Sequence, residues 1–285
     1  MQRIVIKIME DLKIIDAHLH FATESYFDEI AIAAGHKNNA AHLEDCYKAL
    51  GIVHGIVMGN RTLNVEDHIY PKFLSYCIGL DTIVSSNLDW RNDLNKIEQN
   101  LQRRECVGIK LYPGYLHFYV SDDSLAPLYK LAVKYDKPVA VHTGLTAMSG
   151  AYLKYSHPMV IDEAAAKFPA VKFVMCHLGE PWIADAVAVL LKNPNVAADL
   201  SGMLEGKIPN MERFLTKKKF YIKQMRGWLE YLNDYKRIMF GTDWPLANLD
   251  DYIEFVKAFI PQEEWQQVFY KSAISIYHLD KLRTI

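Results

Sequence analysis

Long apolar runs and basic clusters are both missing from this sequence of 285 residues. No apolar run approaches the roughly 18 residues that a membrane-spanning helix needs. The apolar start of the chain is interrupted by Lys7 and Glu10, and no cleavage site follows, so we expect no signal peptide. The formal net charge is −2 and no block of Lys or Arg occurs, which argues against nucleic acid or an anionic membrane as a partner.

Cysteine is also scarce. Cys46, Cys77, Cys106 and Cys176 lie far apart, and none belongs to a Cys-x-x-Cys pair. This spacing predicts reduced thiols in a cytoplasmic protein rather than a disulfide framework. Cys176 directly precedes His177, but the alternation of side chains along a strand would point the thiol away from that histidine.

Short apolar runs that alternate with amphipathic stretches are what the sequence does contain. Apolar residues make up 51% of the chain and charged residues 23%, as in a globular protein with a sizeable core. The predicted strands cover residues 14–20, 51–58, 82–88, 107–112, 137–142, 171–177, 195–200 and 237–243. Helices are predicted over residues 93–104, 124–135, 159–168, 181–192, 211–233, 249–260 and 262–277. This alternation, in a chain near the roughly 250 residues usual for that fold, predicts an α/β protein built as a single (β/α)8 barrel.

One domain is expected over residues 1–285. No Pro/Gly/Ser-rich linker divides the chain, and no Gly-x-Gly-x-x-Gly follows a strand, as it would in many doubly wound sheets. The longest piece outside the barrel pattern runs from Phe21 to Ala41 and belongs to an insertion over residues 21–45. Because loops on that side of a barrel bind substrate, we expect this insertion to be an active-site lid or pocket wall.

A histidine pair marks the end of the first predicted strand, in the segment Asp16-Ala17-His18-Leu19-His20. Side chains alternate between the two faces of a strand, so His18 and His20 should point the same way, with Asp16 beside them. Two neighbouring imidazoles can bind one metal ion. A lone His-x-His pair can equally pack or form hydrogen bonds at a sheet edge, so the pair alone does not decide between these interpretations.

The same kind of residue recurs where other predicted strands end. Lys110, His142, His177 and Asp243 close the fourth, fifth, sixth and eighth strands. The active site of a (β/α)8 barrel lies at this end of its strands. Imidazoles with one carboxylate suit Zn²⁺, with Mn²⁺, Fe²⁺ or Co²⁺ as alternatives, and a catalytic ion of this kind activates water. Asp243 could instead form a turn with the Trp-Pro that follows it.

The other histidines are expected to be solvated or to cap helices, although His36 and His117 fall on loops of the catalytic face. Lys110 is unusual because it stands in an otherwise apolar strand. Three roles are open for it: a carbamate that bridges two metal ions, a charge partner for a substrate carboxylate, or a structural lysine paired with an acid.

These residues together resemble the amidohydrolase superfamily. The similarity rests on His18-Leu19-His20, Val141-His142-Thr143-Gly144, Cys176-His177-Leu178-Gly179, the stretch from Asn195 to Gly202, and Phe240-Gly241-Thr242-Asp243-Trp244-Pro245. The chain is most similar to the amidohydrolase-related branch, which includes aminocarboxymuconate-semialdehyde decarboxylase-like and resorcylate decarboxylase-like enzymes and some lactonases. The match extends from about Ile14 to Tyr277. One departure is Lys271-Ser272-Ala273, where relatives often have an Asn-Ala pair.

This resemblance implies a set of roles. The ligands of one divalent ion, usually zinc, would be His18, His20, His142 and Asp243. His177 would be the catalytic acid or base. In the binuclear subtype, Lys110 would be carboxylated and would bridge two ions, with His142 and His177 on the second. The segment Gly108-Ile109-Lys110-Leu111-Tyr112-Pro113 is similar to the carboxylated-lysine strand of dihydroorotases, but mononuclear relatives carry a similar Gly-x-Lys segment, so the number of ions stays open.

Three functions follow from these expectations. The first is a metal-dependent hydrolase in which a metal-activated water attacks an ester, lactone or amide carbonyl, with His177 and Asp243 moving protons. The second is a non-oxidative decarboxylase of a small aromatic or enoic acid, and the third is a metal-binding barrel without catalysis. The candidate side chains for orienting a planar acid are Arg61, Tyr112, Tyr115, Trp182 and Arg226. A small-molecule substrate is expected, and a homodimer is the commonest assembly for such proteins.

Overall fold

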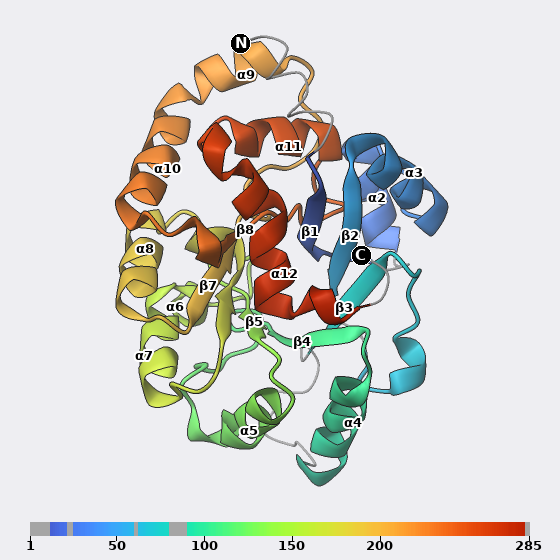
Figure 1. Ribbon diagram of the computed structural model, residues 1–285, viewed down its shortest axis with the longest axis vertical. Coiled ribbons are helices and arrows are strands. Elements are labelled where there is room, and N and C mark those ends of the chain that lie inside the picture. Colours follow the sequence, from blue (N-terminus) through green and yellow to red (C-terminus); the bar gives the residue numbers. More distant parts are fainter. Residues whose placement is uncertain (1–11, 22–24, 60–61, 80–89, 283–285) are drawn as a thin grey trace.

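The computed structural model describes residues 12–21, 25–59, 62–79 and 90–282, and its centre is one eight-stranded sheet (Figure 1). All neighbouring strands are parallel and follow the order of the chain from β1 to β8. The strands are β1 (Ile14–Leu19), β2 (Ile52–Met58), β3 (Leu74–Gly79), β4 (Cys106–Leu111), β5 (Val139–Val141), β6 (Phe173–Met175), β7 (Val196–Asp199) and β8 (Ile238–Met239).

The sheet closes on itself between its first and last strands. The amide of Ala17 in β1 donates to the carbonyl of Phe240, which follows β8, at 3.0 Å. Further along, Leu19 forms a parallel bridge with Trp244. The prediction of a (β/α)8 barrel is therefore confirmed.

Helices surround the strands and connect most of them (Figure 1). The α-helices are α2 (Ser25–Ala33), α3 (Ala40–Leu50), α4 (Trp90–Gln102), α5 (Ala126–Lys134), α6 (Leu153–Ser156), α7 (Met159–Lys167), α8 (Ile183–Lys192), α9 (Met211–Lys217), α10 (Lys219–Leu232), α11 (Leu249–Lys257) and α12 (Ser272–Tyr277). Short 3₁₀ segments lie at 65–67, 123–125, 176–179, 235–237, 262–264 and 279–281, and a π-helical turn covers 267–271. No helix in these described segments is both long and apolar enough to span a membrane.

The core has two shells because each strand buries both of its faces, as parallel strands do. Small and branched side chains such as Ile15, Ala140 and Val174 fill the inside of the barrel. Tyr277 at the end of α12 packs against this inner shell, and α12 lies across the barrel in Figure 1. It covers the end at which the strands begin, since the Tyr277 ring lies against Gly108 near the start of β4. The opposite end is therefore the one that is left for a site.

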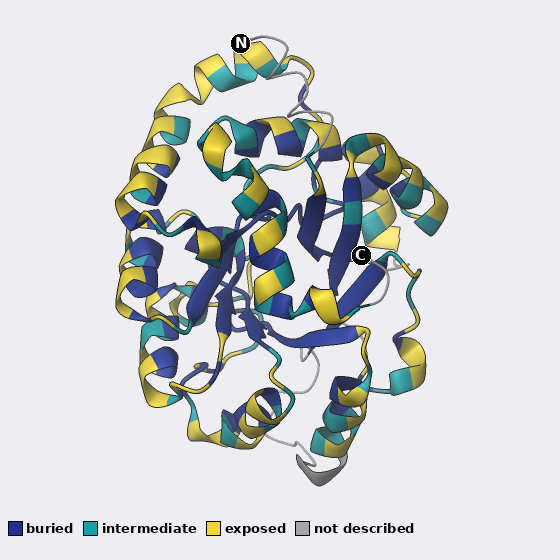
Figure 2. Cartoon of the chain, in the orientation of Figure 1, coloured by how far each residue is buried: buried dark blue, intermediate teal, exposed yellow. Residues whose placement is uncertain are grey.

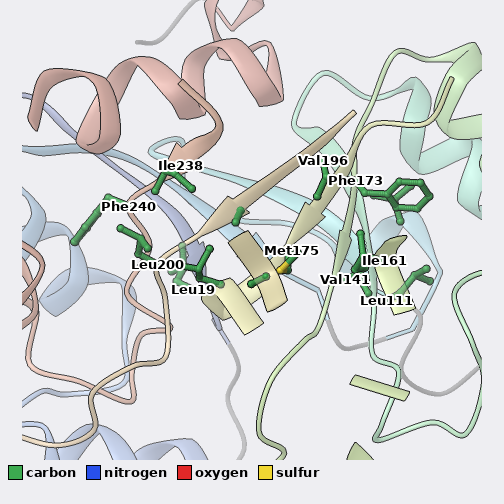
Figure 3. Packing of buried hydrophobic residues seen from close by; sticks show 14 of the residues in the cluster. Leu19, Leu111, Val141, Ile161, Phe173, Met175, Val196, Leu200, Ile238 and Phe240 are labelled. Carbon is green, nitrogen blue, oxygen red and sulfur yellow. The ribbon is translucent and has the colours of Figure 1, made fainter. Parts of the chain in front are cut away.

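The outer shell lies between the strands and the helices. Figure 2 shows the strands as a buried centre inside helices that expose one side. Figure 3 shows part of this shell, where Phe173, Met175 and Val196 of adjacent strands pack together with Ile161 of α7 nearby. Burying such side chains contributes roughly 1.5–3 kcal/mol each to folding. This packing fixes the positions of the strand ends.

The third strand was placed wrongly by the sequence pattern. The barrel strand between β2 and β4 is Leu74–Gly79, whereas the predicted strand over residues 82–88 lies outside the described residues. Several other strands are shorter than predicted, since β6 ends at Met175 and β8 at Met239. The long predicted helix over residues 211–233 is divided at Lys218 into α9 and α10.

The insertion predicted over residues 21–45 contains α2 and the beginning of α3. Within its described part, Phe27 of α2 lies with its ring centroid 5.9 Å from that of His20. The insertion thus reaches the end of the barrel at which the predicted site residues gather. All four cysteines are free thiols, so no disulfide stabilises the fold.

Candidate active site

A β-bulge in β1 directs the two histidines of the His-x-His pair. The four residues from Asp16 to Leu19 are matched against only the three from Gly55 to Val57 in β2. Such an extra residue turns the side chains beyond it. Asp16 therefore points away from the histidines, which corrects the simple alternation that placed all three on one face.

Asp16 instead joins β1 to the end of β8 and to α3. Its carboxylate accepts hydrogen bonds from the Thr242 amide at 2.9 Å, the Thr242 hydroxyl at 2.6 Å and the Tyr47 hydroxyl at 3.0 Å. Burial raises the pKa of Asp16 to about 7, and the bonds from Thr242 and Tyr47 oppose that rise. Since Thr242 precedes Asp243, this contact holds Asp243 beside the histidines of β1.

His18, His20 and Asp243 bring their ligand atoms together at the open end of the barrel. Asp243 Oδ1 lies 3.4 Å from His18 Nε2 and 3.1 Å from His20 Nε2. His18 Nε2 and Asp243 Oδ1 are nonetheless buried without a hydrogen-bond partner among the described residues. A buried polar atom without a partner is costly. Two imidazole nitrogens and a carboxylate oxygen around one point are a donor set that fits a divalent metal ion.

The protonation states of His18 and Asp243 also fit a metal site. Burial lowers the pKa of His18 to about 4, against the opposing effect of Asp199, so its ring is neutral at neutral pH. Burial alone would raise the pKa of Asp243, but the adjacent His18 and His20 hold it well below its usual range. Neutral imidazole and ionised carboxylate are the forms that bind metals.

Asp199 at the end of β7 is a site residue that the sequence analysis did not single out. Its Oδ2 lies 2.9 Å from His18 Nδ1, and its Oδ1 accepts the His177 amide at 2.9 Å and the Ser201 amide at 3.1 Å. Because the carboxylate accepts a hydrogen bond from Nδ1–H of His18, the lone pair of that ring is left on Nε2, which faces Asp243. The signal was present, since Asp199 is a charged residue at the end of an apolar strand, as Asp243 is.

His177 follows β6 in a left-handed backbone conformation, with φ 61° and ψ 17°. For a residue other than glycine this conformation costs of order 1–3 kcal/mol, and the Asp199 carboxylate holds it through the His177 amide. The ring contacts the Ser201 hydroxyl from Nδ1 at 2.9 Å and His142 Nδ1 from Nε2 at 3.2 Å. Burial lowers the pKa of His177, whereas Asp243 and Asp199 raise it.

His142 contacts His177 and does not belong to the group of ligand atoms formed by His18, His20 and Asp243. Its Nε2 donates to the Leu145 carbonyl at 3.1 Å, and its Nδ1 faces His177. Burial, with a further contribution from His177, lowers its pKa well below the usual value. The structure thus places His142 beside His177, and it does not bring a free nitrogen of His142 to His18 and Asp243.

Lys110 is fully buried inside the barrel, and its Nζ donates to the Cys176 thiol at 2.9 Å. The same Nζ lies 5.0 Å from the centre of the Tyr112 ring. Cys176 therefore points into the barrel, on the same face as Val174, as the alternation along the strand predicts. The alternation ends at the next residue, because His177 has a left-handed backbone conformation.

A pocket of about 380 Å³ opens beside these residues. It is lined by Tyr115, His142, Thr143, Leu145, Thr146, Ala147, His177, Glu180, Gly202, Met203, Leu204, Glu205, Asp243 and Leu246. Three of these side chains are carboxylic acids, and none of the described lining residues is Lys or Arg. Burial raises the pKa of Glu180, and Lys218 partly offsets the rise.

The remaining predicted substrate residues are scattered. Tyr115 lines the pocket, and its ring lies 4.9 Å from that of His142. Tyr112 is buried, with its hydroxyl 3.2 Å from the Gly59 carbonyl. Trp182 lines a different surface pocket with His157, and Arg226 is exposed on α10, where it pairs with Glu230. Arg61 lies outside the described residues.

Comparison with known proteins gives a family match and a set of similar structures. A family model described as amidohydrolase matches residues 15–279. No curated relative matches the sequence. An uncharacterized TIM-barrel protein from Bordetella bronchiseptica shares 19% identity at a TM-score of 0.69, over 94% of this chain and 99% of that one.

The descriptions of two further similar structures name different activities. The 5-carboxyvanillate decarboxylase of Sphingomonas paucimobilis shares 12% identity at a TM-score of 0.64, over 94% of this chain and 99% of that one. A Pseudomonas putida protein provisionally assigned as a 2-pyrone-4,6-dicarboxylic acid hydrolase shares 16% at a TM-score of 0.63, over 94% and 98%. At such identities the likeness shows the fold alone.

Proposed function

Because the chain belongs to the amidohydrolase family, we propose that it is a metal-dependent hydrolase of a small ester, lactone or amide. The observation that supports this most strongly is the meeting of His18 Nε2, His20 Nε2 and Asp243 Oδ1 at the open end of the barrel. A bound divalent ion, most simply Zn²⁺, would lower the pKa of water and polarise a carbonyl oxygen there.

The residues around that point supply positioning and proton transfer. His18 is held by Asp199, so that its free nitrogen faces Asp243. Asp243 is ionised and can accept the proton of an attacking water. His177 lies next to the pocket, with its ring held by Ser201 and His142, and can donate a proton to the leaving group. The proton that Asp243 accepts then leaves to solvent and solvent returns one to His177, so both regain their starting protonation states after one turnover.

We propose a single catalytic ion. Lys110 is already engaged by the Cys176 thiol, and the two nitrogens of His142 face Leu145 and His177. His142 is the predicted fourth ligand, and either of its nitrogens would have to exchange a hydrogen bond for the ion. A carboxylated Lys110 would have to leave the thiol to bridge two ions.

The charge of the pocket favours an uncharged or cationic substrate. Glu180 and Glu205 line the same pocket as Asp243, and none of its described lining residues is Lys or Arg, although Lys218 acts on Glu180 from outside the pocket. An aromatic or enoic acid would bring another negative charge to this wall, and like charges brought together on binding cost several kcal/mol. A decarboxylase is the second candidate, because two similar structures are decarboxylases, of 5-carboxyvanillate and of 2,6-dihydroxybenzoate.

The two reactions differ in a product that can be measured directly. The zinc-loaded protein would be incubated with a panel of uncharged lactones and esters and, separately, with hydroxybenzoic acids. Hydrolysis releases acid, which a pH-stat records, whereas decarboxylation releases CO₂. We expect acid release from the uncharged panel, and its loss in Asp243→Asn. Release of CO₂ from the hydroxybenzoic acids, with no acid from the esters, would favour the second candidate.

A further inference from the structure

We propose that His36, His42 and Cys46 form a second metal site, separate from the catalytic one, that binds a transition metal such as Zn²⁺. His42 and Cys46 lie four residues apart on α3, and so on the same side of the helix. His36 lies in the turn between α2 and α3 and faces them. None of the three belongs to the pocket or to the ligand set described above.

The three ligand atoms form a triangle of the size that zinc requires. His36 Nδ1 lies 3.0 Å from His42 Nε2, and Cys46 Sγ lies 3.5 Å from His42 Nε2 and 4.0 Å from His36 Nδ1. With Zn–N and Zn–S bonds of about 2.0–2.3 Å, a tetrahedral ion separates two nitrogens by about 3.3 Å and a nitrogen from a sulfur by about 3.6 Å. Each side of the triangle is within about 0.4 Å of these values, so the ion needs little rearrangement.

The His36 ring has two backbone partners on its other side. Its Nε2 accepts a hydrogen bond from the Leu249 amide at 3.2 Å, and the ring also contacts the carbonyl of Ala247. Binding of an ion at Nδ1 requires the ring proton to lie on Nε2, so the ring would exchange the Leu249 amide for the Ala247 carbonyl as the partner of Nε2. Outer partners of this kind orient metal-binding histidines. Burial and the nearby His42 lower the pKa of His36 to about 4, so the ring is neutral.

The position of the triangle allows a metal ion to enter from solvent and leaves room for a fourth ligand. His36 is buried, whereas His42 and Cys46 are partly exposed, so one side of the site is open to water. Burial raises the pKa of the Cys46 thiol, and coordination would release its proton to solvent. Imidazole nitrogen and thiolate sulfur are both zinc ligands, and three protein ligands with one water is the arrangement of open zinc sites.

The site would connect the insertion to the chain that carries Asp243. The His36 ring lies 6.4 Å from that of Trp244, and Asn248 donates to the Ala34 carbonyl at 3.0 Å. An ion held by His36 and by α3 would therefore fix the turn before α3 against the start of α11. This consequence does not depend on which reaction the catalytic site performs.

Cobalt binding tests the site directly, because a thiolate bound to Co²⁺ gives a near-ultraviolet charge-transfer band and histidines and carboxylates do not. Chelator-treated protein would be titrated with Co²⁺. We expect the band in the wild type, its loss in Cys46→Ser and His42→Ala, and its retention in Cys176→Ser. The variant His20→Ala should also retain it, which separates this site from the catalytic one.

Zinc content gives a second readout on the same proteins. Cys46→Ser is nearly isosteric and should remain folded, as circular dichroism would show, while losing about one zinc ion per chain. Absence of the band in the wild type, or its survival in Cys46→Ser, would overturn the proposal. Its loss in Cys176→Ser alone would also do so, because the thiolate would then lie inside the barrel.

Discussion

Asp199 Oδ2 lies 2.9 Å from His18 Nδ1, although 181 positions separate the two residues in the sequence. The contact joins the end of β7 to the end of β1 across the open mouth of the barrel. It sets which nitrogen of His18 faces Asp243, and the other oxygen of the same carboxylate holds the backbone of His177. One buried acid thus positions both the proposed ligand and the proposed proton donor.

The first prediction concerns this acid. Asp199→Asn keeps the shape of the side chain but removes the charge that favours the Nδ1–H form of His18. Loss of such an outer partner typically weakens metal affinity by roughly 10–100-fold. We expect a decrease of that size in Zn²⁺ affinity, measured by competition with a chromogenic chelator. Asp162→Asn, at the Lys192 ion pair on the surface, is the control and should bind Zn²⁺ as the wild type does.

The second prediction concerns the space beside His177. Gly202 has φ +67°, and a Cβ there would lie 2.8 Å from His177 Nδ1 and 2.9 Å from Asp243 Oδ2. Gly202→Ala should therefore displace both side chains and reduce kcat/KM by roughly 100-fold or more. Gly227→Ala is the matched control, since among the described residues nothing outside the backbone of α10 lies within 4 Å of its Cβ position. It should leave kcat/KM unchanged and stabilise the fold by about 0.5–1 kcal/mol.

The third prediction tests the charge of the pocket. Removing the negative charge of Glu180 by the change to Gln should narrow the preference for an uncharged ester over its carboxylated analogue. We expect about a tenfold change in the ratio of the two kcat/KM values, which corresponds to about 1.4 kcal/mol. Glu163→Gln, at the separate pocket of Trp182, should leave the ratio unchanged. An unchanged ratio in Glu180→Gln would mean that this acid does not face the substrate.

The fourth prediction is a pH dependence away from the site. His54 in β2 is buried, its Nε2 lies 2.8 Å from the Ser75 hydroxyl, and burial lowers its pKa from 6.5 to about 4. Between these values the unfolded chain binds a proton that the folded chain does not. Above pH 6.5 the contribution of His54 to the free energy of unfolding does not change with pH. As the pH falls from 6.5 toward 4, this residue lowers the free energy of unfolding by at most about 1.4 kcal/mol per pH unit.

His54→Gln removes that titration. We expect the difference in unfolding free energy between wild type and variant, from urea denaturation, to shrink as the pH is lowered from about 7 to about 5. A difference that stays constant over this range would show that His54 has an ordinary pKa in the folded protein.

The fold followed from the sequence because the alternation of apolar runs and helices is a local property of the chain. The exceptions have local causes too. The segment Leu74–Gly79 contains one β-branched residue, Ile78, whereas residues 82–84 are Thr-Ile-Val, three β-branched residues in a row. Because β-branched residues favour strands, this local preference misplaced the third strand.

The candidate site could be predicted only in part. His18, His20 and Asp243 meet as the strand-end pattern indicated, because parallel strands all end at one side of a barrel. The direction of Asp16 could not be predicted, nor could the backbone turn at His177, since a bulge and a left-handed residue interrupt the alternation of side chains. These interruptions depend on contacts between distant strands, which a single strand's sequence does not reveal.

The central claim is that His18, His20 and Asp243 hold one catalytic metal ion. Elemental mass spectrometry of purified protein tests it most directly, in a Cys46→Ser background that removes the second proposed site. We expect about one zinc ion per chain, retained in Lys110→Met and lost in His20→Ala and Asp243→Asn. Zinc content that is unchanged in His20→Ala and Asp243→Asn would contradict it.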